Sequence, residues 1–548
     1  MNIHLRRFAL TTALLTSTML GFSQMAVAQE RPTINVALQS VGTAGSLDTS
    51  DNGGTAGRKF QNSIFEQLIA LNLTDPQLSA KPGLATEWHW VNPTVLELKL
   101  RQGVKFHNGD TMTADDVVFS FSDERYGLLP EQKAARDAGK PIFTRADGTT
   151  GIVPPAITAA NRISEWPLLD HVEKVDDYTV RFIMKKPTLD TEARLARVNY
   201  AAIISKRAFQ SAKSWQDFAL HPIATGPYKV VSVDQGSAIR LVSNDDYWGG
   251  KPPIAALNFL VVPEGASRIN GLMSGEYDIV SDVGPDQVPL IKASPDFEVV
   301  GGPVANIRFI ALDETHGPLK NPLIRQALSH SIDRQTIVDT LWSGLTAQAQ
   351  GFQHESFGDL FLKDFKSPAY DPELAKKLLA QAGYNGEPIT YRVHNDYYPN
   401  ELTVAQFDLE NLRKIGFNID FAVADNPTDP SEDRMMSDLS NTAYFPFPIA
   451  LLANNCPNGQ YNTKTNPKTG MWSNEEFDKL CDVLNTSTDK AEVKTAFKRA
   501  LEIIEVEDPG MIVLHQNAIL YGKRANIEWK PSAMFAMDFA PGSFSIKK

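Results

Sequence analysis

The pattern of hydrophobic and polar positions is clearest early in the chain. Leu96, Leu98 and Leu100 alternate with charged residues. A period of two predicts a β-strand that has one face in a core and the other in water. The pair Asn108-Gly109 follows and predicts a turn after the strand.

A capped helix is predicted directly after this turn. Thr113 and Asp116 have the spacing of a capping box, in which two side chains satisfy free backbone N–H groups at the start of a helix. Val117, Val118 and Phe121 then fall on one helical face. A strand, a turn and a capped helix occur in many folds, so spacing alone indicates an α/β or α+β protein.

Two later segments show contrasting patterns. Residues 370–384 predict a helix with Asp371 as its cap, Pro372 in its first turn and Gly383 as its terminator. Residues 127–167 are rich in Gly, Pro, Ala and Lys and have weak periodicity. We expect this second segment to be a long surface loop.

The N-terminus has the pattern of a secretory signal peptide. Arg6 and Arg7 form a positive region, residues 8–22 are apolar, and residues 26–28 form a small-residue cleavage site. The mature chain is predicted to begin at Gln29, and no cysteine follows the cleavage site to carry a lipid. These features predict a periplasmic protein, with a twin-arginine signal as the less favoured alternative to an ordinary one.

Composition narrows the class of protein further. The 548 residues carry a formal net charge of −12, which makes nucleic acid and anionic membranes poor partners. Beyond the signal peptide no segment has the unbroken apolar length of a transmembrane helix. The chain is long enough for about two to four domains.

The chain has two cysteines, Cys456 and Cys481. Because they follow a secretory signal, an oxidising compartment favours a disulfide between them. Two free thiols or a pair of metal ligands are the alternatives, and the absence of a Cys-x-x-Cys motif weighs against the metal.

The order of residues carries more information than their spacing. The chain resembles the large extracellular solute-binding proteins of the peptide/nickel type, family 5, which include dipeptide- and oligopeptide-binding proteins of ABC importers. The resemblance rests on Trp88 and on the segments 98–101, 103–109, 113–117, 224–230, 244–248, 318–338, 370–384, 509–514 and 521–529. These segments follow the family's order over essentially all of the mature chain.

The resemblance implies an α/β, two-lobed periplasmic-binding-protein fold of the large type, with an extra subdomain in the first lobe and a two-strand hinge. We expect a signal peptide over residues 1–28, lobe I over 29–72, an inserted subdomain over 73–205, lobe I again over 206–305, lobe II over 306–515 and a return to lobe I over 516–548.

The implied function is the periplasmic solute-binding component of an ABC importer. Such a protein captures a peptide-sized polar solute, here a peptide, an opine or an oligosaccharide, between two closing lobes and delivers it to a permease in the inner membrane. We expect a monomer that needs no cofactor and is not an enzyme.

A secreted hydrolase or metal-handling protein is the alternative function. The motifs His-Glu-x-x-His, Gly-x-Ser-x-Gly and Gly-x-x-x-x-Gly-Lys are absent. The short motifs of serine β-lactamases occur at residues 50–52, 468–470 and 487–490, but in the wrong order. Metal chelation by scattered histidines stays open, and the candidates are His354, His394 and His515.

Two segments of the second lobe bear on the ligand. The resemblance implies an aspartate for a peptide's ammonium group in residues 441–455, yet this segment has no acidic residue. It also implies an arginine for the peptide's carboxylate in residues 394–400, which contain Asp396 and two tyrosines but no arginine. Because unpaired buried charges are unfavourable, an ordinary short peptide is disfavoured but not discarded.

Aromatic, amide and carboxylate side chains in these segments suit a sugar-like or opine-like solute. The candidate ligand-binding residues are Asn52, Gly53, Asp396, Tyr397, Tyr398, Tyr444, Phe445, Phe447 and Asn454. Packing in a core is the competing interpretation for the aromatic residues, and a solvent-exposed turn is the competing interpretation for Asn52 and Gly53.

Overall fold

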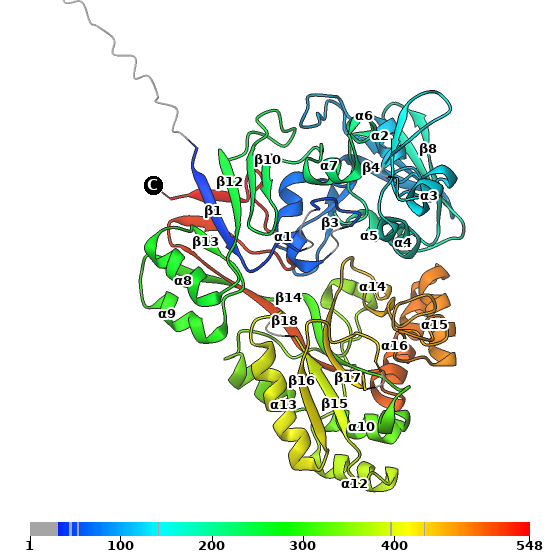
Figure 1. Cartoon of the computed structure of the whole chain (residues 1–548), viewed down its shortest axis with the longest axis vertical. Coiled ribbons are helices and arrows are strands. Elements are labelled where there is room, and N and C mark those ends of the chain that lie inside the picture. The colour runs from blue at the N-terminus through cyan, green and yellow to red at the C-terminus, as the bar shows by residue number, and fades with distance from the viewer. Residues whose placement is uncertain are drawn as a thin grey trace, which may run out of the picture. The chain divides into compact units, whose positions relative to one another are not determined.

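A ten-stranded sheet connects the two halves of the chain. The computed structural model describes residues 31–42, 46–51, 54–140, 142–394, 397–431 and 433–547. The strand order in the sheet is β10-β11-β12-β1-β13-β18-β14-β17-β15-β16. Strands from the beginning, middle and end of the sequence are therefore neighbours, as Figure 1 shows by their colours.

The first half of the sheet belongs to lobe I. Strand β1 (Thr33–Leu38) pairs in parallel with β12 (Ala256–Val261) and β13 (Ile279–Val280), and β11 (Ala238–Ser243) pairs antiparallel with β12 and β10 (Tyr228–Asp234). This lobe also contains α1 (Thr55–Ile64), β2 (Ile69–Leu71), β3 (Ala80–Pro82), α5 (Thr191–Leu195), α6 (Lys206–Ser211), α7 (Trp215–Leu220), α8 (Gly265–Ser274), η1 (Pro285–Gln287), α9 (Val288–Lys292), β19 (Ile527–Trp529) and β20 (Phe544–Ile546).

The other half of the sheet belongs to lobe II. Strand β15 (Ile389–Val393) pairs in parallel with β16 (Ile419–Val423) and β17 (Met436–Thr442). Helices surround these strands: η2 (Gly317–Lys320), α10 (Pro322–His330), α11 (Arg334–Thr336), η3 (Ile337–Leu341), η4 (Glu355–Leu360), α12 (Pro372–Ala382), α13 (Glu401–Ile415), α14 (Ile449–Leu452), α15 (Glu475–Thr486), α16 (Lys490–Leu501) and η5 (Glu502–Glu507).

Two long strands pass through both lobes. Strands β14 (Phe297–Leu312) and β18 (Met511–Arg524) pair antiparallel along most of their length, and Figure 1 shows them running from one group of strands to the other. Their register shifts between Pro303 and Ile307. Just before this shift Gly301 has a φ of 111°, and a Cβ there would lie 2.1 Å from the Ile519 carbonyl oxygen. The fold thus has the two-strand connection between lobes that the sequence predicts.

A separate four-stranded sheet, β4-β5-β9-β8, is inserted in lobe I. Its strands are β4 (Ala85–Asn92), β5 (Val95–Leu100), β8 (Leu169–Asp176) and β9 (Thr179–Met184). The predicted alternation is confirmed in β5, where Leu96 and Leu98 are fully buried. The capping box is also confirmed, since the Thr113 N–H donates to Asp116 Oδ2 at 3.0 Å before α2 (Ala114–Ser120).

The prediction of a long surface loop over residues 127–167 is wrong. The segment contains α3 (Pro130–Asp137), a hairpin of β6 (Ile142–Thr144) and β7 (Thr150–Ile152), and α4 (Ala156–Glu165). The helices are short and mostly exposed, which explains the weak periodicity. Ile152 and Trp166 nevertheless bury their side chains in the core, so burial of a few apolar residues orders the segment.

The helix predicted near residue 372 is confirmed. Helix α12 is capped by Asp371, whose carboxylate accepts from the Leu374 N–H at 2.9 Å, and it ends at Gly383 with a φ of 69°. Helix α10 ends at His330, and Asp333 caps the next helix, α11. The exact domain boundaries given above stay a prediction.

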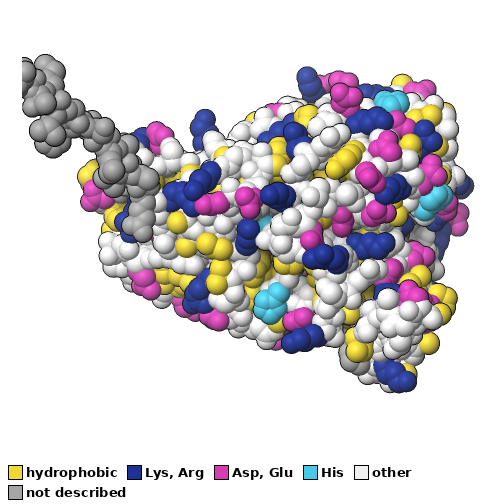
Figure 2. Space-filling model, turned by 90° about the horizontal axis from the view of Figure 1, so that it is seen from above, with side chains coloured by type: hydrophobic (Ala, Val, Ile, Leu, Met, Phe, Trp, Pro, Cys, Tyr) yellow, Lys and Arg dark blue, Asp and Glu magenta, His cyan; other side chains and the backbone are white. Residues whose placement is uncertain are grey.

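Cys456 and Cys481 form a disulfide with an S–S distance of 2.02 Å, which ties residues after α14 to α15. Both residues are buried. Among the described residues, none of the helices has both the length and the apolar character that crossing a bilayer requires. Positive and negative side chains are interspersed over the face shown in Figure 2.

Removal of this disulfide should destabilise the protein. In the chain-entropy model, a bridge that closes a loop of this size stabilises by about 3 kcal/mol. The double variant Cys456→Ala/Cys481→Ala should lose about this much free energy of unfolding, measured by urea denaturation with circular dichroism. An unchanged midpoint would contradict the chain-entropy account of this bridge.

Candidate functional site

Side chains of the two lobes meet where α1 faces the segments before α13 and after β17. The hydroxyl of Thr55 lies 3.4 Å from that of Tyr397, although the two residues are 342 positions apart. The guanidinium carbon of Arg58 lies 3.8 Å from the centre of the Tyr444 ring. Each contact joins lobe I to lobe II, so this region is the candidate ligand site.

Helix α1 places its basic residues inside the protein. Arg58 and Lys59 are 4% and 5% exposed, although adjacent charged residues on a helix are usually solvated. Lys59 forms a buried ion pair with Asp282, a non-glycine residue with a φ of 57°. Burial lowers the pKa of Arg58 to about 10, so its guanidinium group remains charged at neutral pH.

A second buried guanidinium group lies beside the first. Arg197 is 4% exposed, and its Nη1 atom donates to the carboxylate of Glu165 at the end of α4. Its guanidinium carbon lies 4.9 Å from the Tyr200 ring centre and 5.0 Å from the Tyr444 ring centre. Arg58 and Arg197 therefore contact the same tyrosine of lobe II.

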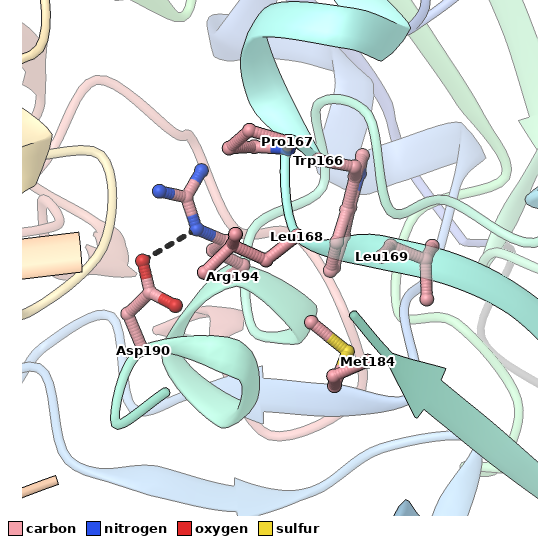
Figure 3. Close-up of a pocket in the computed structure, with 7 residues that line it drawn as sticks. All are labelled: Trp166, Pro167, Leu168, Leu169, Met184, Asp190 and Arg194. Carbon is pink, nitrogen blue, oxygen red and sulfur yellow. Dashed lines mark hydrogen bonds and ion pairs between the residues drawn. The ribbon is translucent and has the colours of Figure 1, made fainter. Parts of the chain in front are cut away.

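Arg194 is close to this region, but its Nε and Nη1 atoms form hydrogen bonds within lobe I. Its Nε atom donates to Asp190 at 2.6 Å, as Figure 3 shows, and its Nη1 atom donates to the Glu165 carbonyl oxygen at 2.6 Å. The cavity drawn in Figure 3 has a volume of about 10 Å³, no more than one water molecule occupies. This cavity reflects packing around Arg194 and is too small for a solute.

A charged cluster inside lobe II holds the segment that carries Tyr397 and Tyr398. Arg308 on β14 donates to Glu401 at 3.0 Å and to Asp438 at 2.6 Å, and its guanidinium carbon lies 4.3 Å from the Tyr398 ring centre. Glu401 also accepts from the Tyr398 N–H at 3.0 Å. A strand of the hinge is thus connected by charge-assisted hydrogen bonds to the start of α13.

Burial and charge act on the two carboxyl groups of this cluster with different results. Burial raises the pKa of Glu401, but the Arg308 charge and the hydrogen bonds that Glu401 accepts together outweigh it and keep this pKa below its usual value. Burial raises the pKa of Asp438 to about 7, against the opposing effect of Arg308. Glu401 is therefore the carboxylate that neutralises Arg308 over the wider pH range.

The structure brings several predicted residues to the boundary between the lobes. Tyr397 is 46% exposed, and Tyr398 is half-buried with its hydroxyl group hydrogen-bonded to Ser440. Tyr444 is half-buried, and Phe445 is buried with its ring centre 4.8 Å from the Arg194 guanidinium carbon.

For the other predicted ligand-binding residues, the structure gives no hydrogen bond or ring contact across the lobe boundary among the described residues. Phe447 is 5% exposed and packs in the hydrophobic core, and Asn454 is half-buried, with its backbone carbonyl accepting from the Tyr461 N–H. A ligand-binding role for these two stays a prediction. Asn52, Gly53 and Asp396 lie outside the described residues.

Sequence analysis missed the arginines. Arg58, Arg197 and Arg308 belong to segments far apart in the chain, and each has the polar character of a surface residue. Arg58 has no distinguishing local signal, because its helix also carries Lys59, Gln61 and Asn62. The ion pairs of Arg197 and Arg308 depend on the fold.

The three histidines considered for metal binding do not form a site. In the part of the chain that the structure describes, no three His, Cys, Asp or Glu side chains are grouped to hold a metal ion. His354 and His515 are buried, and burial lowers the pKa of each, to about 4 and about 3 respectively. His354 Nδ1 accepts from the Ser356 N–H at 3.1 Å.

Two α/β lobes, a two-strand hinge and side chains that meet across the lobe boundary define the class of two-lobed binding proteins. Residues 79–462 match the family described as bacterial extracellular solute-binding proteins, family 5 Middle, and the chain belongs to this family. Members of the family are substrate-binding proteins of ABC importers, not enzymes.

Individual relatives are distant but cover much of the chain. The chain is 26% identical over 379 residues to the dipeptide-binding protein of Escherichia coli K12. The matched region covers 66% of this chain and 67% of the relative. The dipeptide-binding protein of Pseudoalteromonas sp. SM9913 in complex with Met-Leu has a TM-score of 0.77 at 23% identity, covering 94% of this chain and all of that one. MoaA of Agrobacterium R10 in complex with mannopinic acid has a TM-score of 0.75 at 23% identity, covering 95% of this chain and all of that one.

Loss of Glu401 should destabilise lobe II. Glu401→Ala removes an acceptor from buried Arg308 and from the Tyr398 N–H, so the free energy of unfolding should fall by about 3 kcal/mol. The matched control is Glu410→Ala on the same helix, where the side chain is 72% exposed and pairs with Lys414. The control should change stability by less than about 1 kcal/mol. Equal effects of the two variants in urea denaturation would contradict this role for Glu401.

Proposed function

We propose that this protein is the periplasmic solute-binding component of an ABC importer, which captures a peptide-sized polar solute between its lobes and delivers it to a permease in the inner membrane. The signal-peptide pattern in residues 1–28 supports the periplasmic location. The proposal includes a monomeric protein that works without a cofactor.

The observation that carries the proposal is the pair of contacts across the lobe boundary. Thr55 meets Tyr397 and Arg58 meets Tyr444, while β14 and β18 connect the lobes behind them. A solute that contacts both lobes favours the closed arrangement by its differential affinity, and a permease can recognise that arrangement. The function is thus conformational and requires no reacting group.

Three kinds of ligand are compatible with the family: peptides, opines and oligosaccharides. Relatives whose structures share this fold bind Met-Leu and mannopinic acid. Residues 441–455 carry no carboxylate for a peptide's ammonium group. The aromatic rings of Tyr397 and Tyr444 at the boundary suit the C–H faces of a polyol, which favours an opine or a sugar-like solute over an ordinary dipeptide.

Tyr444→Ala should abolish solute binding and leave the melting temperature nearly unchanged. The ring is half-buried, and its centre lies 3.8 Å and 5.0 Å from the guanidinium carbons of Arg58 and Arg197 in the opposite lobe, so its loss removes a contact between the lobes. Native mass spectrometry of protein from its own periplasm would identify a bound solute. Thermal-shift screening with dipeptides, opines, oligosaccharides and nickel complexes would then select one for X-ray scattering.

The wild-type protein should become more compact when the selected solute is added, and Tyr444→Ala should not. Tyr370→Ala is the matched control, since Tyr370 is a 42% exposed tyrosine on the surface of lobe II. It should compact like the wild type. Turnover of a solute into product, or compaction of Tyr444→Ala equal to that of the wild type, would refute the proposed role.

A further inference from the structure

Among the described residues, none pairs with one complete edge of the Arg197 guanidinium group. Its Nη1 atom is used by Glu165, but its Nε and Nη2 atoms are buried and have no hydrogen-bond partner among the described residues. Nε–H and Nη2–H point to the same side of the planar group. They form the two-pronged edge that binds both oxygen atoms of a carboxylate.

The surroundings of this edge favour an anion. The side chains of Arg58, Arg197 and Glu165 act on one another electrostatically, and two of these three groups are guanidinium groups. Tyr200 adds a ring 4.9 Å from the Arg197 guanidinium carbon. The facing segment of lobe II, residues 441–455, has no acidic residue that would compete for Arg197.

The guanidinium group of Arg197 is contacted from the opposite lobe. The ring centres of Tyr444 and Phe445 lie 5.0 Å and 5.7 Å from the Arg197 guanidinium carbon. Both residues follow β17 in lobe II, whereas Arg197 follows α5 in lobe I. Separation of the lobes would therefore uncover Arg197, and closure would remove a bound anion from water.

A buried N–H group without a partner destabilises a protein, and more so when it is charged. The same groups can stabilise a complex when a ligand supplies the acceptors. An ionised acceptor makes hydrogen bonds that are shorter and stronger than those of a neutral one. A carboxylate fits the two adjacent N–H groups better than a hydroxyl or an amide oxygen does.

We propose that Arg197 forms the carboxylate-binding subsite of the interlobe site, with Arg58 adding positive charge and Tyr444 closing over the bound group, so that the transported solute carries a carboxylate group. This inference rests on the proposed function. It also explains how the protein binds a carboxylate although residues 394–400 contain no arginine. The charge comes from lobe I.

Two pairs of probes test the subsite on the wild-type protein. Mannopinic acid is compared with mannitol, and Met-Leu is compared with its C-terminal amide, by titration calorimetry at low ionic strength. In each pair that binds, the carboxylate-bearing member should bind more tightly, by about ten- to a hundredfold, because hydrogen bonds to charged groups contribute about 1.5–3 kcal/mol.

Arg197→Lys then tests the residue itself. Lysine keeps the charge beside Glu165 but lacks the two-pronged edge, so affinity for the carboxylate-bearing probe should fall about tenfold or more, while affinity for the probe without the carboxylate should change little. Arg194→Lys is the matched control, because Arg194 is also buried and packs on Phe445 but uses its Nε and Nη1 atoms within the protein. It should keep the preference of the wild type.

Each other outcome overturns the inference in a distinguishable way. If mannitol or the amide bound as tightly as the carboxylate-bearing probe of its pair and caused compaction in X-ray scattering, the carboxylate subsite would be refuted. The proposed importer function would not be affected. Equal loss of preference in Arg197→Lys and Arg194→Lys would assign the effect to packing. Failure of all four probes to bind or to cause compaction would count against the subsite and the proposed function together.

Discussion

The antiparallel pairing of β14 with β18 is the constraint on which the other parts of the structure depend. The two strands contribute to the sheet in both lobes, so residues near the start, middle and end of the chain become neighbours. Pairing is interrupted between Pro303 and Ile307, which leaves fewer backbone hydrogen bonds to resist bending at that point. Gly301 allows β18 to approach closely beside the interruption, where any side chain would collide with a carbonyl oxygen. Rigid lobes and a weakened connection are the physical requirements of hinge motion.

Charge is distributed unequally between the two sides of the lobe boundary. Lobe I supplies the guanidinium groups of Arg58 and Arg197, and lobe II supplies tyrosine and phenylalanine rings. In lobe II the buried Arg308 is neutralised within its own lobe by Glu401 and Asp438. That cluster therefore orients the segment with Tyr397 and Tyr398 and adds little net charge to the boundary. The side of the site that attracts an anion and the side that shields it from water come from different lobes.

Local sequence patterns predicted those parts of the fold that are determined locally. The alternation in β5 and the caps of α2 and α12 depend on neighbours within a few residues, and they were predicted correctly. The segment 127–167 was missed because its helices are short and its order depends on burying Ile152 and Trp166 against distant elements. Family resemblance predicted the two lobes and the hinge. Pattern analysis alone indicated only a mixed α/β protein.

In the candidate site, too, local sequence predicted some residues, whereas the positions of others depend on long-range packing. Tyr397, Tyr398, Tyr444 and Phe445 were predicted from the composition of two segments, and they lie at the lobe boundary or directly behind it. Arg58 and Arg197 could not be predicted, since a basic residue is ordinarily interpreted as solvated. Their burial results from long-range packing of α1, α4 and the segment after α5, which no local period reveals.

The contacts across the boundary also limit the free energy by which a solute can favour closure of the lobes. A cation–π contact contributes about 0.5–2 kcal/mol, depending on how well water is excluded. Arg58 and Arg197 make two such contacts with Tyr444 in the arrangement described here. A solute that enters between Arg197 and Tyr444 replaces part of this attraction with its own, so only the difference between the two drives closure. A carboxylate gives a favourable difference because it also satisfies N–H groups that the tyrosine ring leaves without acceptors. Closure by such a solute remains reversible, as release to a permease requires.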